Sequence, residues 1–271
     1  MSGRRFAALP MYDFPHLASA HDDWWRAIAA RLRADGVDAV PAALTRHRSH
    51  VDTWRDPQLL LGQACEYPLW KAFGNSVRLV ATPRYRAPGC DGANYRSAIL
   101  VRADDHAGSI ADLKGRRCVI NERDSNSGMN LMRAAVAPFA GGDRFFTSVS
   151  VSGAHVRSAQ MLIEGGADVA AIDCVTFAHL SSADPALTGR LRILAWTPAS
   201  PCLPYITARS TDGATLGVLR RAMTAALDDP AAGAAGATLL LRGFDFEPDE
   251  SLQVGGDLER GAAALGYPRL V

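Results

Sequence analysis

The segment 124–130 contains the residues whose types and spacing indicate the clearest chemistry, which is the binding of an anion. An apolar strand pattern ends at Asn121, and a helical pattern begins near Ser127. The first N–H groups of a helix have no acceptor within it, and the helix dipole makes that end attractive to anions. A glycine there keeps the first turn open. We therefore predict ligand contacts from Ser125, Asn126, Ser127, Gly128 and Asn130. The alternative is that Ser125 or Ser127 only caps the helix.

Two more junctions between a predicted strand and a predicted helix carry polar side chains. Ser152 and His155 lie at one of them, where the imidazole could donate to an anion or cap the helix locally. Asp173 ends another strand, and ligands of open α/β sheets bind at the carboxyl ends of strands. Its carboxylate suits a ligand amine, or it caps the helix that begins near Thr176.

Aromatic and amide side chains follow the same rule in the first part of the chain. Tyr12, Gln63 and Tyr67 lie at or just after predicted strands, so we expect them to enclose a small polar ligand. Tyr95 and Trp196 lie beside proline-rich breaks and could line the same site. For each aromatic residue the alternative is packing in the core.

The elements that must position these residues alternate between strand and helix, which favours an α/β fold. Two proline-rich breaks, at 83–94 and 197–204, isolate a middle block of strands and helices. We predict two lobes, residues 1–95 plus 199–271 and residues 96–198, with a ligand cleft between them. Strands are expected at 5–11, 42–45, 58–65, 77–82, 95–102, 117–121, 145–151, 168–173, 191–196 and 205–208. Helices are expected at 16–34, 66–73, 127–139, 153–164, 176–181, 214–227, 231–241 and 249–265.

The composition is that of a globular protein, with 271 residues, 48% hydrophobic and 21% charged, and a net charge of +1. The near balance of charge argues against a nucleic-acid partner. There is no P-loop, GxSxG, HExxH or dinucleotide glycine motif, so we predict no cofactor, no metal and no catalytic residue. The five widely spaced cysteines are expected to be thiols. The first ten residues do not read as a secretory signal. The expectation is a cytoplasmic chain if the sequence is complete, and a periplasmic one if a signal has been removed.

Five segments in order resemble the type 2 periplasmic substrate-binding proteins, and among them the phosphate/phosphonate-type binding proteins of ABC transporters. The segments are Tyr95–Arg102, Ser109–Arg117, Asp124–Gly128, Val151–His155 and Gly165–Asp173. The resemblance implies two α/β lobes with mostly parallel sheets flanked by helices, joined by a two-strand hinge, that close on a small ligand. It also implies that segment 124–130 grips phosphate or phosphonate oxygens.

From the residues and the resemblance together we predict a monomeric solute-binding protein that captures a small anionic or zwitterionic molecule by lobe closure. Its expected partners are that ligand and the membrane subunits of an ABC transporter. One alternative is a cytoplasmic biosynthetic enzyme on the same fold, similar to thiamine-pyrimidine or menaquinone-pathway enzymes, with Cys65 or Cys174 as the nucleophile. A ligand-sensing module that docks onto another protein is the third possibility.

Overall fold

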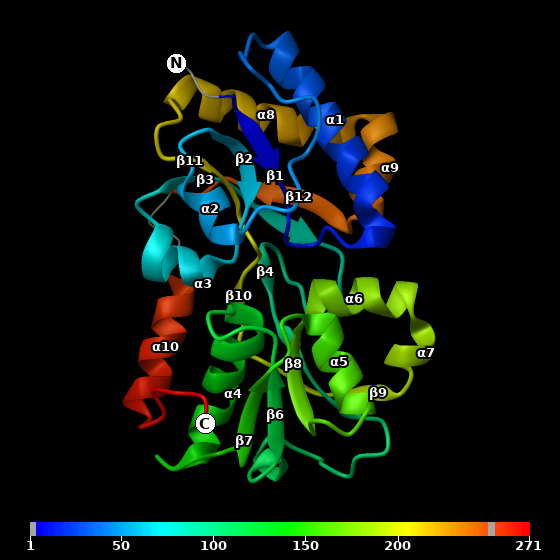
Figure 1. Ribbon diagram of the computed structural model, residues 1–271, viewed down its shortest axis with the longest axis vertical. Coiled ribbons are helices and arrows are strands. Elements are labelled where there is room, and N and C mark those ends of the chain that lie inside the picture. Colours follow the sequence, from blue (N-terminus) through cyan, green and yellow to red (C-terminus); the bar gives the residue numbers. More distant parts are fainter. Residues whose placement is uncertain (1–3, 249–252) are drawn as a thin grey trace. The chain divides into compact units, whose positions relative to one another are not determined.

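The computed structural model describes residues 4–248 and 253–271, and the chain divides into two compact units (Figure 1). Unit 1 comprises the described residues of Met1–Arg86 and Pro201–Leu252. Unit 2 comprises Ala87–Ser200 and Gln253–Val271. None of the described helices is long and apolar enough to cross a lipid bilayer.

Unit 1 is built on a five-stranded sheet with helices packed against it. In spatial order the strands are β1 (Phe6–Ala8), β2 (Leu59–Gln63), β11 (Tyr205–Ala208), β3 (Val77–Tyr85) and β12 (Leu241–Asp245). The helices are η1 (Pro15–Leu17), α1 (Ala18–Ala34), α2 (His50–Arg55), α3 (Glu66–Pro68), η2 (Leu69–Phe73), α8 (Gly213–Asp228) and α9 (Pro230–Thr238). β2 is buried along its whole length, and Leu59, Leu69 and Ile206 lie in one apolar cluster with Trp54 and Phe73. Burial of this apolar surface holds the strand ends of unit 1 in place.

Unit 2 has its own five-stranded sheet. In spatial order the strands are β7 (Ser148–Val151), β6 (Arg117–Ile120), β8 (Val169–Asp173), β5 (Ser97–Arg102) and β9 (Leu191–Trp196). The helices are η3 (Ala111–Leu113), η4 (Asn126–Asn130), α4 (Leu131–Ala140), α5 (His155–Ile163), α6 (Cys174–Ala183), α7 (Pro185–Thr188) and α10 (Val254–Ala264). Residues of β5, β6 and β8 form a core with α5. Two short strands, β4 (Asn94–Tyr95) and β10 (Ser200–Pro201), pair separately.

Both sheets are mixed, where the sequence predicted mostly parallel ones. In unit 2, β6 pairs in parallel with β7 and β8, but β5 runs antiparallel to β8 and β9. Among the described strands of unit 1, the β1–β2 pair is parallel, whereas β11 and β12 run antiparallel to their neighbours. Two of these antiparallel strands, β5 and β11, follow a passage of the chain from one unit into the other. The alternation of strands and helices in the sequence favoured parallel pairing, and nothing in it indicated that β5 and β11 run antiparallel to their neighbours.

The C-terminal residues belong to unit 2, so the expected assignment of 199–271 to the first lobe is wrong for its last part. The cause is the docking of α10 on α4 and η4. Asn130 Nδ2 donates to the Gly255 carbonyl at 2.9 Å, and the N–H groups of Phe145 and Phe146 donate to the Val271 carbonyl at 2.9 and 3.0 Å. The chain therefore passes between the units three times, where the sequence predicted two passages.

Most predicted elements are present within a few residues of their expected bounds, with three differences. The expected strand 42–45 is irregular and makes a single backbone bond to β1, from the Thr45 N–H to the Ala7 carbonyl at 2.7 Å. α2, α7, β10 and β12 had no predicted counterpart. For β12, the helix expected to end at 241 covered its first residue. Residues 249–252, the expected start of the last helix, lie outside the described residues.

Candidate ligand-binding site

The helix that follows β6 opens with backbone donors that have no backbone acceptor. Ser125 is its N-cap, and the Ser125 hydroxyl accepts a hydrogen bond from the Gly128 N–H at 3.0 Å. The first backbone bond runs from the Asn130 N–H to the Ser125 carbonyl at 3.0 Å and so spans five residues instead of four. This wider turn leaves more N–H groups unpaired than an α-helical start does. Within the described residues, the N–H groups of Asn126 and Ser127 donate to no backbone oxygen, and the Met129 N–H makes no bond to a residue before η4.

Two hydroxyls and an imidazole lie beside these N–H groups. The hydroxyls of Ser125 and Ser127 are 3.3 Å apart, and Ser127 Oγ shares a hydrogen bond of 2.8 Å with His155 Nε2. His155 begins α5, and its Nδ1 is buried without a hydrogen-bond partner among the described residues. Burial lowers the pKa of His155 to about 4, so the imidazole is neutral at pH 7. The side chains of Ser125, Ser127 and His155 at this turn are therefore polar and uncharged at pH 7.

The carboxamides of Asn126 and Asn130 are held in a network within unit 2. Asn126 Nδ2 donates to the hydroxyls of Tyr95 at 3.2 Å and Ser200 at 2.8 Å. Asn130 Nδ2 donates to Asn126 Oδ1 at 2.8 Å, and Arg133 donates to Asn130 Oδ1. Asn126, Asn130 and Tyr95 are all buried. A buried hydrogen-bond network of this kind fixes the position of the helix opening.

Gly128 is required for a reason that the sequence did not suggest. A Cβ built there would lie 1.9 Å from Asn121 Oδ1, so the Asn121 carboxamide occupies the space that a side chain at position 128 would need. Asn121 Oδ1 is itself buried and has no hydrogen-bond partner among the described residues. Sequence reasoning did not single out Asn121, although its place as the last residue of a predicted strand was a usable signal.

The remaining predicted residues of unit 2 have defined local contacts. Asp173 is the N-cap of α6, and Asp173 Oδ1 accepts from the Thr176 N–H at 2.8 Å, as in the capping alternative. Ser152 Oγ shares a hydrogen bond of 2.7 Å with Ser158 Oγ and donates to the Ala154 carbonyl at 2.9 Å. Trp196 is half-buried, packs on the core of unit 2 and lies against Gly89.

In unit 1 the three predicted residues are buried. The ring of Tyr12 meets that of Tyr85 edge-on, with centroids 5.5 Å apart. Gln63 Nε2 donates to the Tyr85 hydroxyl at 3.0 Å and to the Leu203 carbonyl at 3.2 Å, and Gln63 Oε1 has no partner among the described residues. Lys71 Nζ donates to the Tyr67 hydroxyl at 3.2 Å. The structure thus brings Tyr12 and Gln63 together around Tyr85, while Tyr67 contacts Lys71.

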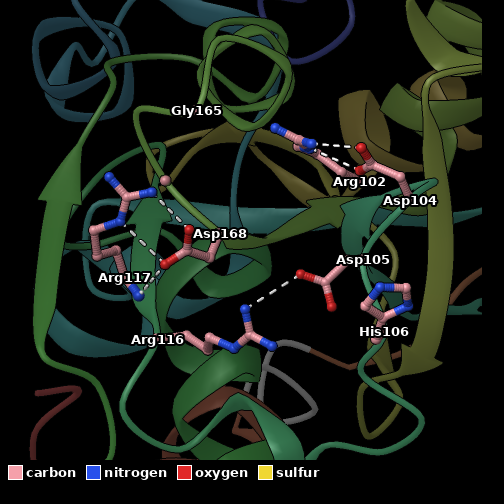
Figure 2. Close-up of a pocket in the computed structure, with 9 residues that line it drawn as sticks. Arg102, Asp104, Asp105, His106, Arg116, Arg117, Gly165 and Asp168 are labelled. Carbon is pink, nitrogen blue, oxygen red and sulfur yellow. Dashed lines mark hydrogen bonds and ion pairs between the residues drawn. The ribbon is translucent and has the colours of Figure 1, made fainter.

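A hollow of about 300 Å³ lies at the other end of the unit 2 strands, where Arg117 begins β6 and Asp168 precedes β8 (Figure 2). None of the predicted site residues lines it. Figure 2 shows Arg117 facing Asp168, with N–O distances of 2.7 to 3.1 Å, and Arg116 reaching Asp105 at 3.4 Å. The hydrogen bonds from Arg117 hold the pKa of Asp168 below its usual range. Because its arginines are already bound to carboxylates, this hollow is a poor anion site.

Cys174, one of the two cysteines that the enzyme alternative would use, is not activated. Cys174 is 1% exposed, and its hydrogen bond with Cys90, together with burial, raises the pKa of its thiol. A nucleophilic cysteine needs the opposite shift.

A family model and several solved structures match this chain. A family model described as "ABC transporter, phosphonate, periplasmic substrate-binding protein" matches residues 6–247. Among curated proteins, none matches this sequence.

Solved structures share the fold at low sequence identity. PhnD1 of Prochlorococcus marinus, in complex with methylphosphonate, is 12% identical with a TM-score of 0.75, covering 95% of this chain and 97% of that one. XAC2383 of Xanthomonas citri, bound to ATP, is 17% identical with a TM-score of 0.71, covering 97% and 98%. A binding protein component of an ABC phosphonate transporter from Pseudomonas aeruginosa is 13% identical with a TM-score of 0.71, covering 96% and 87%.

Proposed function

We propose, from the premise that this chain belongs to the periplasmic phosphonate-binding proteins of ABC transporters, that it captures a phosphonate or a similar small phosphorus oxyanion at the opening of η4. The ligand-contacting groups in this proposal are the N–H groups of Asn126, Ser127 and Met129 with the hydroxyls of Ser125 and Ser127. The family match supports the ligand class, and the unpaired N–H groups at the start of η4 support this position for the binding site.

The observation that carries the proposal is the set of backbone donors without backbone acceptors at the start of η4. A phosphonate group has three oxygens that accept hydrogen bonds, and N–H groups at a helix N-terminus suit such an anion. η4 continues directly into α4, so the dipole of a helix from Asn126 to Ala140 adds to the attraction. Because His155 is neutral at pH 7, the ligand's charge is balanced by these dipoles and not by an ion pair with that side chain.

The other predicted residues complete the proposal. Asp173 would accept a ligand amine, so that aminoalkylphosphonates are candidate ligands beside methylphosphonate. Tyr12, Gln63 and Tyr67 of unit 1 are further proposed ligand contacts. The membrane subunits of an ABC transporter are the proposed partners, and the family membership supports them.

The test is isothermal titration of methylphosphonate and inorganic phosphate into the parent chain, Ser125→Ala, Ser127→Ala and the double variant. Each lost hydrogen bond to a charged ligand should weaken binding by about 10- to 100-fold. Ser49→Ala is the matched control, because Ser49 caps α2 through the Asp52 N–H at 3.0 Å in the same manner but lies in unit 1. Parent-like affinity in a folded double variant would rule out this site.

A further inference from the structure

Two cysteine sulfurs of unit 2 lie in contact, far apart in sequence and outside the proposed binding turn. Cys90 Sγ and Cys174 Sγ are 3.4 Å apart, and both residues are thiols in the structure. Cys90 belongs to the segment 87–94, which we call the connecting loop because it follows the first passage of the chain between the units. Cys174 is the first residue of α6.

The backbone on both sides holds the sulfurs in this position. In the connecting loop, the Cys90 N–H donates to the Ala87 carbonyl at 3.0 Å, and Asp91 and Asn94 exchange backbone hydrogen bonds of 2.9 and 3.0 Å. On the other side the Cys174 N–H donates to the Arg96 carbonyl at 3.2 Å, directly after the pairing of Ser97 with Asp173. The two thiols are therefore fixed by elements of one unit.

Gly89 allows the close approach of the loop. Its φ of +98° is a conformation that favours glycine, and a Cβ there would lie 2.5 Å from Trp196 Cζ3 and 3.0 Å from Cys174 Cβ. The residue next to Cys90 is thus pressed against the residue that carries the second thiol. This close packing brings Cys90 to Cys174.

We propose that Cys90 and Cys174 form a redox modification site, which a small-molecule disulfide such as oxidised glutathione converts into an intramolecular disulfide. The bond would bring the sulfurs from 3.4 Å to about 2.05 Å. It would tie the connecting loop to the first turn of α6, directly after Asp173. This inference does not depend on the proposed ligand.

The reaction is two successive thiol–disulfide exchanges. Cys90 is partly exposed and Cys174 is buried, so the Cys90 thiolate attacks the small disulfide first and releases one small thiolate. Cys174 Sγ then attacks Cys90 Sγ, forms the protein disulfide and releases the second small thiolate. The raised pKa of Cys174 makes this the slower step, and it proceeds because the two sulfurs are already in contact within one molecule. The two protons from the cysteine thiols pass to the released thiolates. Two cysteines are oxidised and one small disulfide is reduced to two thiols.

The experiment exposes the reduced full chain to increasing ratios of oxidised to reduced glutathione, then denatures it, alkylates the remaining thiols and maps tryptic peptides. Cys90 and Cys174 fall in separate tryptic peptides, 87–96 and 158–190, and no other cysteine lies in either. We expect a cross-linked pair of these two peptides, with alkylatable thiols falling from five to three. The oxidised chain should melt several degrees higher, and dithiothreitol should reverse the shift.

The controls separate this pair from general cysteine oxidation. Cys65→Ser removes the other partly exposed thiol and should leave the cross-link intact. Cys90→Ser should abolish the cross-link, with Cys174 still recovered as an alkylated thiol because it is buried. The proposal is overturned if the oxidised parent chain carries glutathione on Cys90 while Cys174 stays alkylatable, or if Cys90 is linked to any other cysteine.

Discussion

Single side chains decide how the opening of η4 is held. The Ser125 hydroxyl accepts a hydrogen bond from the Gly128 N–H, and the Ser125 carbonyl accepts one from the Asn130 N–H. One residue therefore sets the width of the turn. Asn121 packs where a side chain at position 128 would lie. The residue types Ser, Asn and Gly could be predicted to matter from their position after a strand. The contact with Asn121 could not, because it depends on the path of the backbone between 121 and 128.

Gly128→Ala should therefore destabilise the protein. The added Cβ would meet Asn121 Oδ1 at 1.9 Å, and overpacking of this kind costs about 1–3 kcal/mol in the free energy of unfolding. Urea denaturation followed by circular dichroism measures the change. In the matched variant Gly217→Ala, within α8, the nearest atom is Arg221 Nη1 at 3.5 Å, so the substitution should be neutral or stabilising by up to about 1 kcal/mol. Equal unfolding free energies for the two variants would contradict this explanation.

At the scale of elements, α10 attaches the C-terminal segment to unit 2. It packs on α4 and η4, and the buried Arg133 of α4 joins the segment to the site. Arg133 Nη1 donates to the Pro268 carbonyl at 3.0 Å, and another guanidinium nitrogen lies 3.7 Å from a Glu259 carboxylate oxygen. The helical pattern of 249–265 predicted a helix but held no information about which sheet it covers. That choice is made by tertiary hydrogen bonds such as these.

Arg133→Met should loosen the C-terminal segment while keeping most of the buried apolar stem. A hydrogen bond to a charged group contributes about 1.5–3 kcal/mol to stability. We therefore expect the free energy of unfolding to fall by an amount of that order. Faster proteolysis of residues 253–271 should accompany it. Arg157→Met is the control, since the Arg157–Glu164 pair is exposed and such pairs contribute about 0–1 kcal/mol. Parent-like stability in Arg133→Met would show that α10 is held by its apolar contacts alone.

Across the whole molecule, the two-unit α/β architecture could be predicted from the proline-rich breaks and the strand-and-helix alternation. The direction of β5 and β11 and the third passage of the chain could not. Each depends on pairings between segments about a hundred residues apart, such as Ala98 with Trp196. The hydrophobic periodicity of a segment indicates that one of its faces is buried, but it does not indicate which other segment covers that face.

The lobe closure predicted from the sequence should make the molecule more compact on ligand binding. Closure around a bridging ligand is stabilised only by the ligand's contacts in the closed state. Small-angle X-ray scattering with saturating methylphosphonate should show a smaller radius of gyration than without it. The Ser125→Ala/Ser127→Ala double variant at the same methylphosphonate concentration should keep the ligand-free value. An unchanged radius in a parent chain shown by calorimetry to be saturated would contradict closure.

The contact between Trp196 and Gly89 has an optical consequence. Of the five tryptophans, Trp24, Trp25, Trp54 and Trp70 belong to unit 1, and Trp196 is the single one of unit 2. Its indole lies against the connecting loop, beside the carbon that carries the Cys174 thiol. The difference in fluorescence between the parent chain and Trp196→Phe therefore isolates the emission of one ring at that loop, and this protein carries its own probe of the loop without any added dye.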